Sequence, residues 1–165
     1  MLWQAFASAA PSLALPGKAR FDQAGIALIG TIRKDGSPRI DPVEPFFAQG
    51  HLLLGMLRDS RKANDLLRDP RCVLHSAVSR PDGSEREFKL LGRAVVVQSD
   101  DLSQGYSQAF AAKWHAPPPA GFPGHLFSLD IASAALLTWD LEHGEMLVKR
   151  WSLQAGLTET RRKYP

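Results

Sequence analysis

The chain has 165 residues, of which 44% are apolar and 22% are charged, a composition typical of one globular domain. No segment approaches the roughly 18 to 20 uncharged apolar residues that a membrane-spanning helix needs, so we expect no membrane span. The formal net charge of +3 owes much to the last few residues, and the sequence has neither an RNA-binding signature nor zinc-finger spacing, so we expect no nucleic-acid partner.

The first twenty residues predict a short helix that lies on the body of the domain. Four apolar residues recur there at helical spacing: Trp3, Phe6, Ala10 and Leu13. The segment has neither the basic start nor the unbroken apolar run of a secretory signal, and Cys72 is the only cysteine, so no intrachain disulfide can form. We expect a cytoplasmic protein with one domain over residues 1–165, a helical segment over residues 1–20 and a tail over residues 155–165.

Three strands are predicted next. Residues 26–33 are rich in apolar and β-branched side chains, and the Asp35-Gly36 pair behind them is a strong hairpin signal. The returning strand carries three prolines, which cannot donate to a ladder, so we expect it at a sheet edge or bulged. The third strand spans residues 51–57, after a turn at Gln49-Gly50.

A helix and two further strands follow. Ser60 is a good N-cap for a helix that buries Ala63, Leu66 and Leu67 and ends at Pro70. Strands are predicted over residues 71–78 and 85–98, joined by a turn at Pro81-Asp82-Gly83. Gly92 lies inside the second of these strands and predicts a bulge.

The last third of the chain predicts one more helix and two more strands. Asp100 or Asp101 can cap the helix, and a loop with three consecutive prolines follows it. The strands span residues 125–137 and 146–151. About seven strands with short connections favour a mainly β protein, in which antiparallel strands form a closed or partly closed barrel.

The segment Ser60-Arg61-Lys62 is the strongest candidate for a binding site. The two cations stand in the first helical turn, where the helix already has positive potential and each cation costs on the order of 0.3 to 1 kcal/mol unless an anion lies against it. Free backbone N–H groups, the serine hydroxyl and the two cations suit a phosphate group. The alternative is that both side chains extend into solvent.

Three motifs in order carry a resemblance: the hairpin at residues 31–39 with Pro42-Val43, then Ser60-Arg61-Lys62, then Asp69-Pro70-Arg71 leading into residues 72–75. Over about residues 20–98 the sequence resembles the pyridoxamine 5'-phosphate oxidase superfamily of FMN-binding split barrels. The resemblance implies a split barrel of antiparallel strands, a homodimer with the flavin at the subunit interface, and FMN as the cofactor.

The resemblance also implies which residues bind the cofactor. The Ser-Arg-Lys segment grips the phosphate in that family, the second and third strands contact the flavin, and a polar residue and a tryptophan complete the site. The positions that correspond in this sequence are Arg39, Ile40, Asp41, Pro42, Gly55, Met56, Ser60, Arg61, Lys62, Glu87 and Trp151.

Three features depart from the best-known members of the family. Gly55 and Met56 stand where those members have a Tyr-Thr pair, so backbone contacts would have to replace the hydroxyls. Glu87 replaces a glutamine that can donate to the flavin ring, whereas a carboxylate can only accept. Trp151 is kept without its matching arginines, so we do not expect pyridoxamine phosphate as the substrate. These departures leave a deazaflavin coenzyme as the alternative to FMN.

We therefore expect an FMN-dependent oxidoreductase that acts on a small molecule, because a flavin supplies the redox chemistry and the protein orients it. The alternatives are a flavin-binding protein that stores or senses the cofactor, and a reductase that uses the deazaflavin coenzyme. No dinucleotide, P-loop or common hydrolase motif occurs. The five histidines lack metal-ligand spacing, so we expect no metal site.

Overall fold

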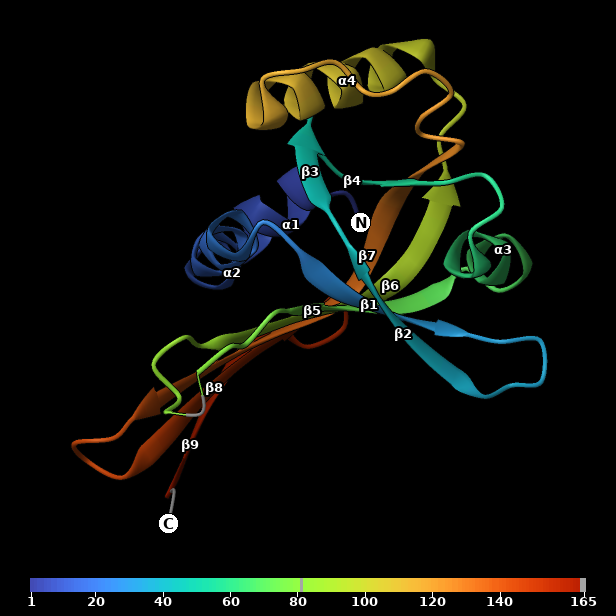
Figure 1. Ribbon diagram of the computed structural model, residues 1–165. Coiled ribbons are helices and arrows are strands. Elements are labelled where there is room, and N and C mark those ends of the chain that lie inside the picture. The colour runs from blue at the N-terminus through green and yellow to red at the C-terminus, as the bar shows by residue number, and fades with distance from the viewer. Residues whose placement is uncertain (81, 164–165) are drawn as a thin grey trace.

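The computed structural model describes residues 1–80 and 82–163, which form four helices and nine strands (Figure 1). The helices are α1 (Trp3–Ala9), α2 (Pro11–Ala24), α3 (Arg61–Arg68) and α4 (Asp100–Trp114). The strands are β1 (Ala27–Ile32), β2 (Pro38–Val43), β3 (Pro45–Ala48), β4 (His51–Met56), β5 (Arg71–Ser76), β6 (Glu87–Val96), β7 (His125–Asp140), β8 (Glu145–Ser152) and β9 (Gly156–Lys163).

All nine strands belong to one sheet in which every pairing is antiparallel, with the order β2-β1-β5-β6-β7-β4-β3. The long strand β7 pairs with β6 on one side, and on its other side it pairs first with β4 and then with β8. Because β7 changes partner, the β8–β9 hairpin leaves the body of the molecule as an arm, at the lower left of Figure 1. The prediction of a mainly β split barrel is confirmed.

Local signals placed several features correctly. The hairpin between β1 and β2 closes with a hydrogen bond from the Arg33 N–H to the Ser37 carbonyl, and Gly36 takes a φ of 84° that favours glycine. The register between β6 and β7 shifts at Gly92, as predicted for a bulge. A Cβ at this position would overlap the carbonyl of Asp130, so only glycine allows the two strands to approach there.

The proline-rich strand was predicted as one element and is two, because the chain leaves the ladder at Glu44. Strand β2 pairs only with β1, and β3 pairs only with β4, so both lie at ends of the strand order. The expected edge position is confirmed, and the break sends β3 to the opposite end of the sheet from β2.

Three further predictions are corrected. The N-terminal segment forms two helices, which meet at Ala10. Ser99, rather than Asp100 or Asp101, caps α4, because its hydroxyl accepts from the Leu102 N–H. The tail expected over residues 155–165 contains β9, and with β3 it brings the strands of the described residues to nine. The turn predicted at Pro81 lies partly outside the described residues.

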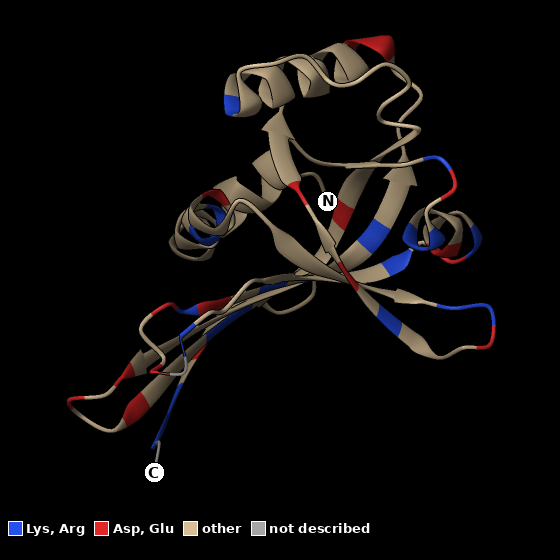
Figure 2. Cartoon of the chain, viewed as in Figure 1, with Lys and Arg blue, Asp and Glu red and all other residues tan. Residues whose placement is uncertain are grey.

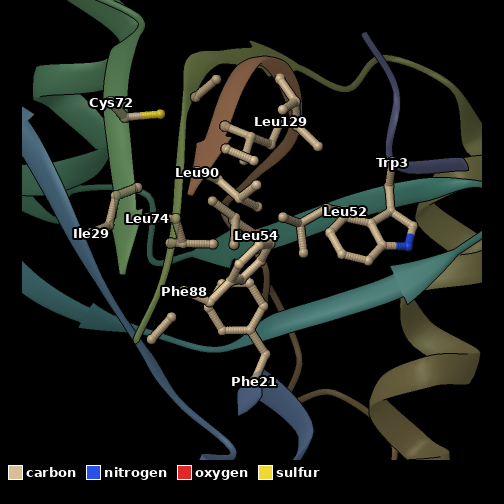
Figure 3. Packing of buried hydrophobic residues seen from close by; sticks show 14 of the residues in the cluster. Trp3, Phe21, Ile29, Leu52, Leu54, Cys72, Leu74, Phe88, Leu90 and Leu129 are labelled. Carbon is tan, nitrogen blue, oxygen red and sulfur yellow. The ribbon is translucent and has the colours of Figure 1, made fainter. Parts of the chain in front are cut away.

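The main core fills the space between the curved sheet and helices α1 and α2 (Figure 3). Phe21 of α2 and Phe88 of β6 meet edge to face there, with ring centroids 5.3 Å apart. Burial raises the pKa of the Cys72 thiol to about 12, so this thiol is protonated at neutral pH. In the described residues, no helix is long and apolar enough to cross a membrane.

A second apolar cluster lies between α4 and the outer face of β3 and β4. It contains Phe46, Leu53, Tyr106 and Leu126. Strand β4 is therefore buried on both faces, since its neighbours Leu52 and Leu54 point into the main core. The end of this strand leads directly to α3.

Candidate functional site

Helix α3 begins as the sequence predicts. Ser60 has extended backbone angles, and its hydroxyl accepts a hydrogen bond from the Ala63 N–H at 3.4 Å. The first turn contains Arg61 and Lys62 and no acidic residue. Neither cation forms an ion pair with a carboxylate of the described residues, although other cations nearby do. The positive end of the helix is therefore uncompensated by the protein.

The two cations have different surroundings. The Lys62 ammonium donates to the Pro42 carbonyl at the end of β2, so its side chain crosses the gap between α3 and the sheet. Arg61 is exposed. Figure 2 shows basic and acidic residues side by side on the neighbouring β1–β2 hairpin and on α3. An anion that lies between β2 and α3 would meet Lys62 first.

A cavity of about 350 Å³ lies against this helix start, within the range usual for small-molecule sites. Five of the predicted cofactor-binding residues line it: Pro42, Gly55, Met56, Ser60 and Lys62. The sequence did not identify the other five lining residues, Ile26, Val43, Glu44, Leu57 and Phe122, as part of a site. Most of these are apolar, so the cavity combines one cationic end with an apolar wall.

Helix α4 explains why residue 55 is a glycine. A Cβ at Gly55 would overlap the phenol oxygen of Tyr106, and it would lie 3.2 Å from the side chain of Pro123. Tyr106 itself is 1% exposed, and burial, followed by the nearby charge of Glu44, raises its pKa well above the usual range. A neutral hydroxyl from α4 thus occupies the space that a side chain at position 55 would fill.

Three predicted residues on β2 lie outside the cavity. Arg39 borders a separate open hollow with Arg33 and Lys34, and its Nε donates to Asp65 at 2.7 Å. Asp41 lies 4.0 Å from the same guanidinium. Ile40 is 70% exposed on the opposite face of the strand. None of these three residues lines the cavity with Pro42 and Lys62.

Asp65 is a buried carboxylate that the sequence did not single out. Its oxygens accept from Thr31 at 3.0 Å, from Arg39 at 2.7 Å and from Arg68 at 3.1 Å. Burial alone would raise the pKa of Asp65, but these hydrogen bonds outweigh it and lower the pKa below its usual range. The predicted helix face is corrected accordingly, because Asp65 is buried while Leu67 is 46% exposed.

Glu87 and Trp151 also lie away from the cavity of their own chain. Glu87 accepts from Lys89 at 3.0 Å and lies 3.6 Å from the His75 ring, beside a larger hollow lined by Trp139 and Met146. Trp151 is buried, and its ring lies edge to face with that of Phe6 at 5.1 Å. Neither side chain can complete the α3 site from within the same chain.

The described residues contain no group of three His, Cys, Asp or Glu side chains that could hold a metal ion. The larger hollow beside Glu87 carries charges of both signs, from Arg80, Arg86, Asp82 and Glu85 among others, and much of its polar lining is already hydrogen-bonded within the loop. The cavity at α3 is therefore the better candidate site, because its lining cation Lys62 has no carboxylate partner in the described chain. The predicted residue Arg61 lies next to it on the helix but does not line the cavity.

One protein family matches most of the chain. Residues 17–138, which are more than half of the sequence, match the family model for pyridoxamine 5'-phosphate oxidase. A search of curated proteins finds no match.

Solved structures share the fold at low sequence identity. A pyridoxamine 5'-phosphate oxidase-related, FMN-binding protein from Nostoc punctiforme is 15% identical, with a TM-score of 0.61 over 93% of this chain and 96% of that one. PhzG from Burkholderia lata, in complex with tetrahydrophenazine-1-carboxylic acid, is 13% identical, with a TM-score of 0.61 over 98% and 93%. A heme-binding protein from Mycobacterium smegmatis is 13% identical, with a TM-score of 0.56 over 90% and 88%.

Proposed function

We propose, from the premise that this chain belongs to the pyridoxamine 5'-phosphate oxidase family, that it binds FMN with the phosphate at the start of α3 and acts as an oxidoreductase on a small organic molecule. The observation that carries the proposal is the pair Arg61 and Lys62, which stands in the first helical turn without any carboxylate partner in the described chain. A bound phosphate would remove this electrostatic conflict.

The residues at the cavity fit a phosphate-bearing flavin. The backbone N–H groups of the first turn, the Ser60 hydroxyl and the Lys62 ammonium would hold the phosphate. The apolar lining residues, among them Val43 and Met56, would exclude water from the flat ring beside them. Gly55 lines the same cavity, and the Tyr106 phenol fills the space beside it where a side chain would otherwise lie. When bound, FMN supplies the hydride or single-electron transfer.

A homodimer is part of the proposal, because one face of the sheet exposes an apolar row. Ile40, Gly30, Val73 and Leu91 are cross-strand partners in register across β2, β1, β5 and β6. Ile40 is 70% exposed and Leu91 is 47% exposed, and such contiguous apolar surface is typical of interfaces. A second copy on this face would also bring a second Glu87 toward the cavity, which the first copy's own Glu87 does not line, whereas Trp151 is buried in the core of each copy.

The first test is an absorption spectrum of the purified protein followed by titration with FMN. We expect a flavin spectrum and saturable FMN binding. The double variant Arg61→Ala/Lys62→Ala should weaken FMN binding at least about tenfold, since charge-assisted contacts to the phosphate are lost. The matched control is Arg162→Ala/Lys163→Ala, which removes another adjacent Arg-Lys pair from exposed positions on β9. Equal FMN affinity in the two double variants would show that the phosphate lies elsewhere.

Turnover is tested separately from binding. Reduction of the bound flavin by NAD(P)H or dithionite, followed by reoxidation with an added acceptor, supports an oxidoreductase. A yellow protein that turns over no acceptor indicates a flavin-binding protein that stores or senses the cofactor. A colourless protein that ignores FMN but binds the deazaflavin coenzyme would keep the fold and change the cofactor.

A further inference from the structure

The cavity contains a second charged side chain, Glu44, which no part of the phosphate site uses. Glu44 stands between β2 and β3, at the point where the chain passes from one end of the strand order to the other. Together with Lys62 it supplies all the charge among the lining residues. Its side chain is half-buried, and the residue lines the cavity.

The described residues leave the Glu44 carboxylate poorly paired. Its Oε2 accepts one long hydrogen bond, 3.4 Å from the indole nitrogen of Trp114. No described cation lies within ion-pairing distance of it, and Lys62 instead donates to the Pro42 carbonyl. A carboxylate has about four acceptor positions, so most of the hydrogen-bonding capacity of Glu44 is unused.

The neighbouring hydroxyl does not neutralise this charge. Tyr106 feels the charge of Glu44, and the phenol stays protonated because burial and that charge both raise its pKa. A neutral phenol can donate a hydrogen bond but cannot offset a negative charge. Phe122, whose ring centroid is 6.4 Å from that of Tyr106, continues the same wall with an apolar surface.

The charge balance of the cavity changes when the phosphate binds. An anion at Lys62 cancels the positive end of the cavity, so Glu44 then carries the remaining uncompensated charge. The adjoining lining residues Ile26, Leu57 and Phe122 have apolar side chains, which offer that carboxylate no competing hydrogen-bond donor. A cationic ligand would therefore bind the FMN-loaded site more tightly than a neutral one, and an anionic ligand would be repelled.

We infer that Glu44 is a specificity-determining residue that selects a cationic ligand, a small molecule with a protonated amine on an otherwise apolar ring. The amine would donate to the Glu44 carboxylate, while the ring would lie on the apolar surface of Phe122. This inference rests on the proposed function, because the phosphate must first neutralise Lys62.

The experiment uses a matched set of probes on the FMN-loaded protein. Benzylamine, benzyl alcohol and benzoate share a ring and differ in charge, and binding of each is followed through the change in the flavin absorption spectrum. We expect benzylamine to bind at least about tenfold more tightly than benzoate at neutral pH, with benzyl alcohol between them. Glu44→Gln keeps the shape and removes the charge, so its preference should fall to within about threefold.

The control is Glu142→Gln, which removes the same charge from an exposed turn and should keep the full preference. Benzoate that binds the wild-type protein as tightly as benzylamine overturns the inference without any variant, and so does a preference that Glu44→Gln leaves unchanged. These results leave FMN binding intact, and so leave the proposed function standing. Failure of the wild-type protein to bind FMN at all overturns both.

Discussion

The positive charges at the start of α3 lack carboxylate partners, whereas those further along the helix have one. At the start of the helix, Arg61 and Lys62 have no carboxylate partner in the described chain. One turn further on, Arg39 and Arg68 converge on the buried carboxylate of Asp65, which also accepts from Thr31. Both groups of cations lie on the same short helix or against it, yet only the second is satisfied by the protein itself.

This difference distinguishes residues that stabilise the fold from residues that we assign to ligand binding. A saturated buried carboxylate fixes α3 against β1 and β2, because it joins Thr31 on one strand, Arg39 on the other and Arg68 on the helix. Cations that lack a partner contribute nothing comparable to folding and cost free energy at a helix start. We therefore assign the Asp65 group to stability and the Arg61-Lys62 pair to ligand binding, and each assignment predicts a different response to mutation.

The largest loss of stability is expected when the hydrogen-bonded group around Asp65 is broken. Asp65→Ala leaves Thr31 and Arg39 without their acceptor and should lower the free energy of unfolding by about 3 kcal/mol, near the low end for a broken buried pair because Arg68 is partly exposed. Urea denaturation measures this loss. Asp69→Ala is the control, since the Arg71 that it pairs with is exposed, and it should shift the urea midpoint far less. Equal losses in the two variants would contradict the role given to Asp65.

The same carboxylate predicts a pH dependence. Its pKa is lowered in the folded protein, so the stability that it contributes is present above its unfolded pKa of about 3.9 and is lost as the pH falls through the lower folded pKa. Asp65→Asn lacks this contribution at every pH. The stability gap between wild type and Asp65→Asn should therefore be constant from pH 7 to pH 5 and narrow below pH 4. A gap that stays constant to pH 2 would show that Asp65 gains nothing from ionisation.

The start of α3 could be read from the sequence because its signals are local. Ser60 and the two cations behind it are adjacent, and so are the residues of the β1–β2 hairpin. The bulge at Gly92 was equally visible, because a glycine inside a strand typically marks a bulge or a close approach of two backbones. The cavity could be predicted in part through the family resemblance, which identified five of its lining residues: Pro42, Gly55, Met56, Ser60 and Lys62.

The hydrogen-bonded group around Asp65 could not be predicted from the sequence in the same way, because the partners of Asp65 on the strands are distant in sequence. Thr31 and Arg39 are separated from Asp65 by 34 and 26 residues, and the apolar Leu67 looked like the better candidate for burial. Strand β9 was missed for another reason, since nearly all of its residues are exposed and show no alternation of apolar and polar side chains. The overlap of Tyr106 with the space beside Gly55 depends on how α4 packs, which no local pattern encodes.

A smaller gain in stability is expected when an anion is supplied to Arg61 and Lys62 at the start of α3. If the cofactor-free protein binds inorganic phosphate there with a Kd of about 10 mM, 50 mM phosphate should add about 1 kcal/mol to the free energy of unfolding. Thermal unfolding in phosphate and in chloride of equal ionic strength measures the gain. Arg61→Ala/Lys62→Ala should lose most of it, whereas Arg162→Ala/Lys163→Ala should keep it. Because phosphate also stabilises proteins through general exclusion, the contrast between the two double variants, not the gain itself, is the decisive result.

The smallest expected changes in the free energy of unfolding have opposite signs at the two ends of α3. In phosphate-free buffer, Arg61→Gln removes a cation from the positive end of the helix dipole and should raise the free energy of unfolding by about 0.3 to 1 kcal/mol, while it weakens FMN binding. Arg68→Gln removes a cation from the last turn, where it favours the helix and also donates to Asp65 and to the Ile32 carbonyl, so this variant should lose stability. Urea titrations of both variants without cofactor measure the two changes. A stabilised Arg61→Gln protein that binds FMN poorly would show that residue 61 is kept for the ligand at the expense of the fold, and a destabilised one would show that Arg61 supports the fold after all.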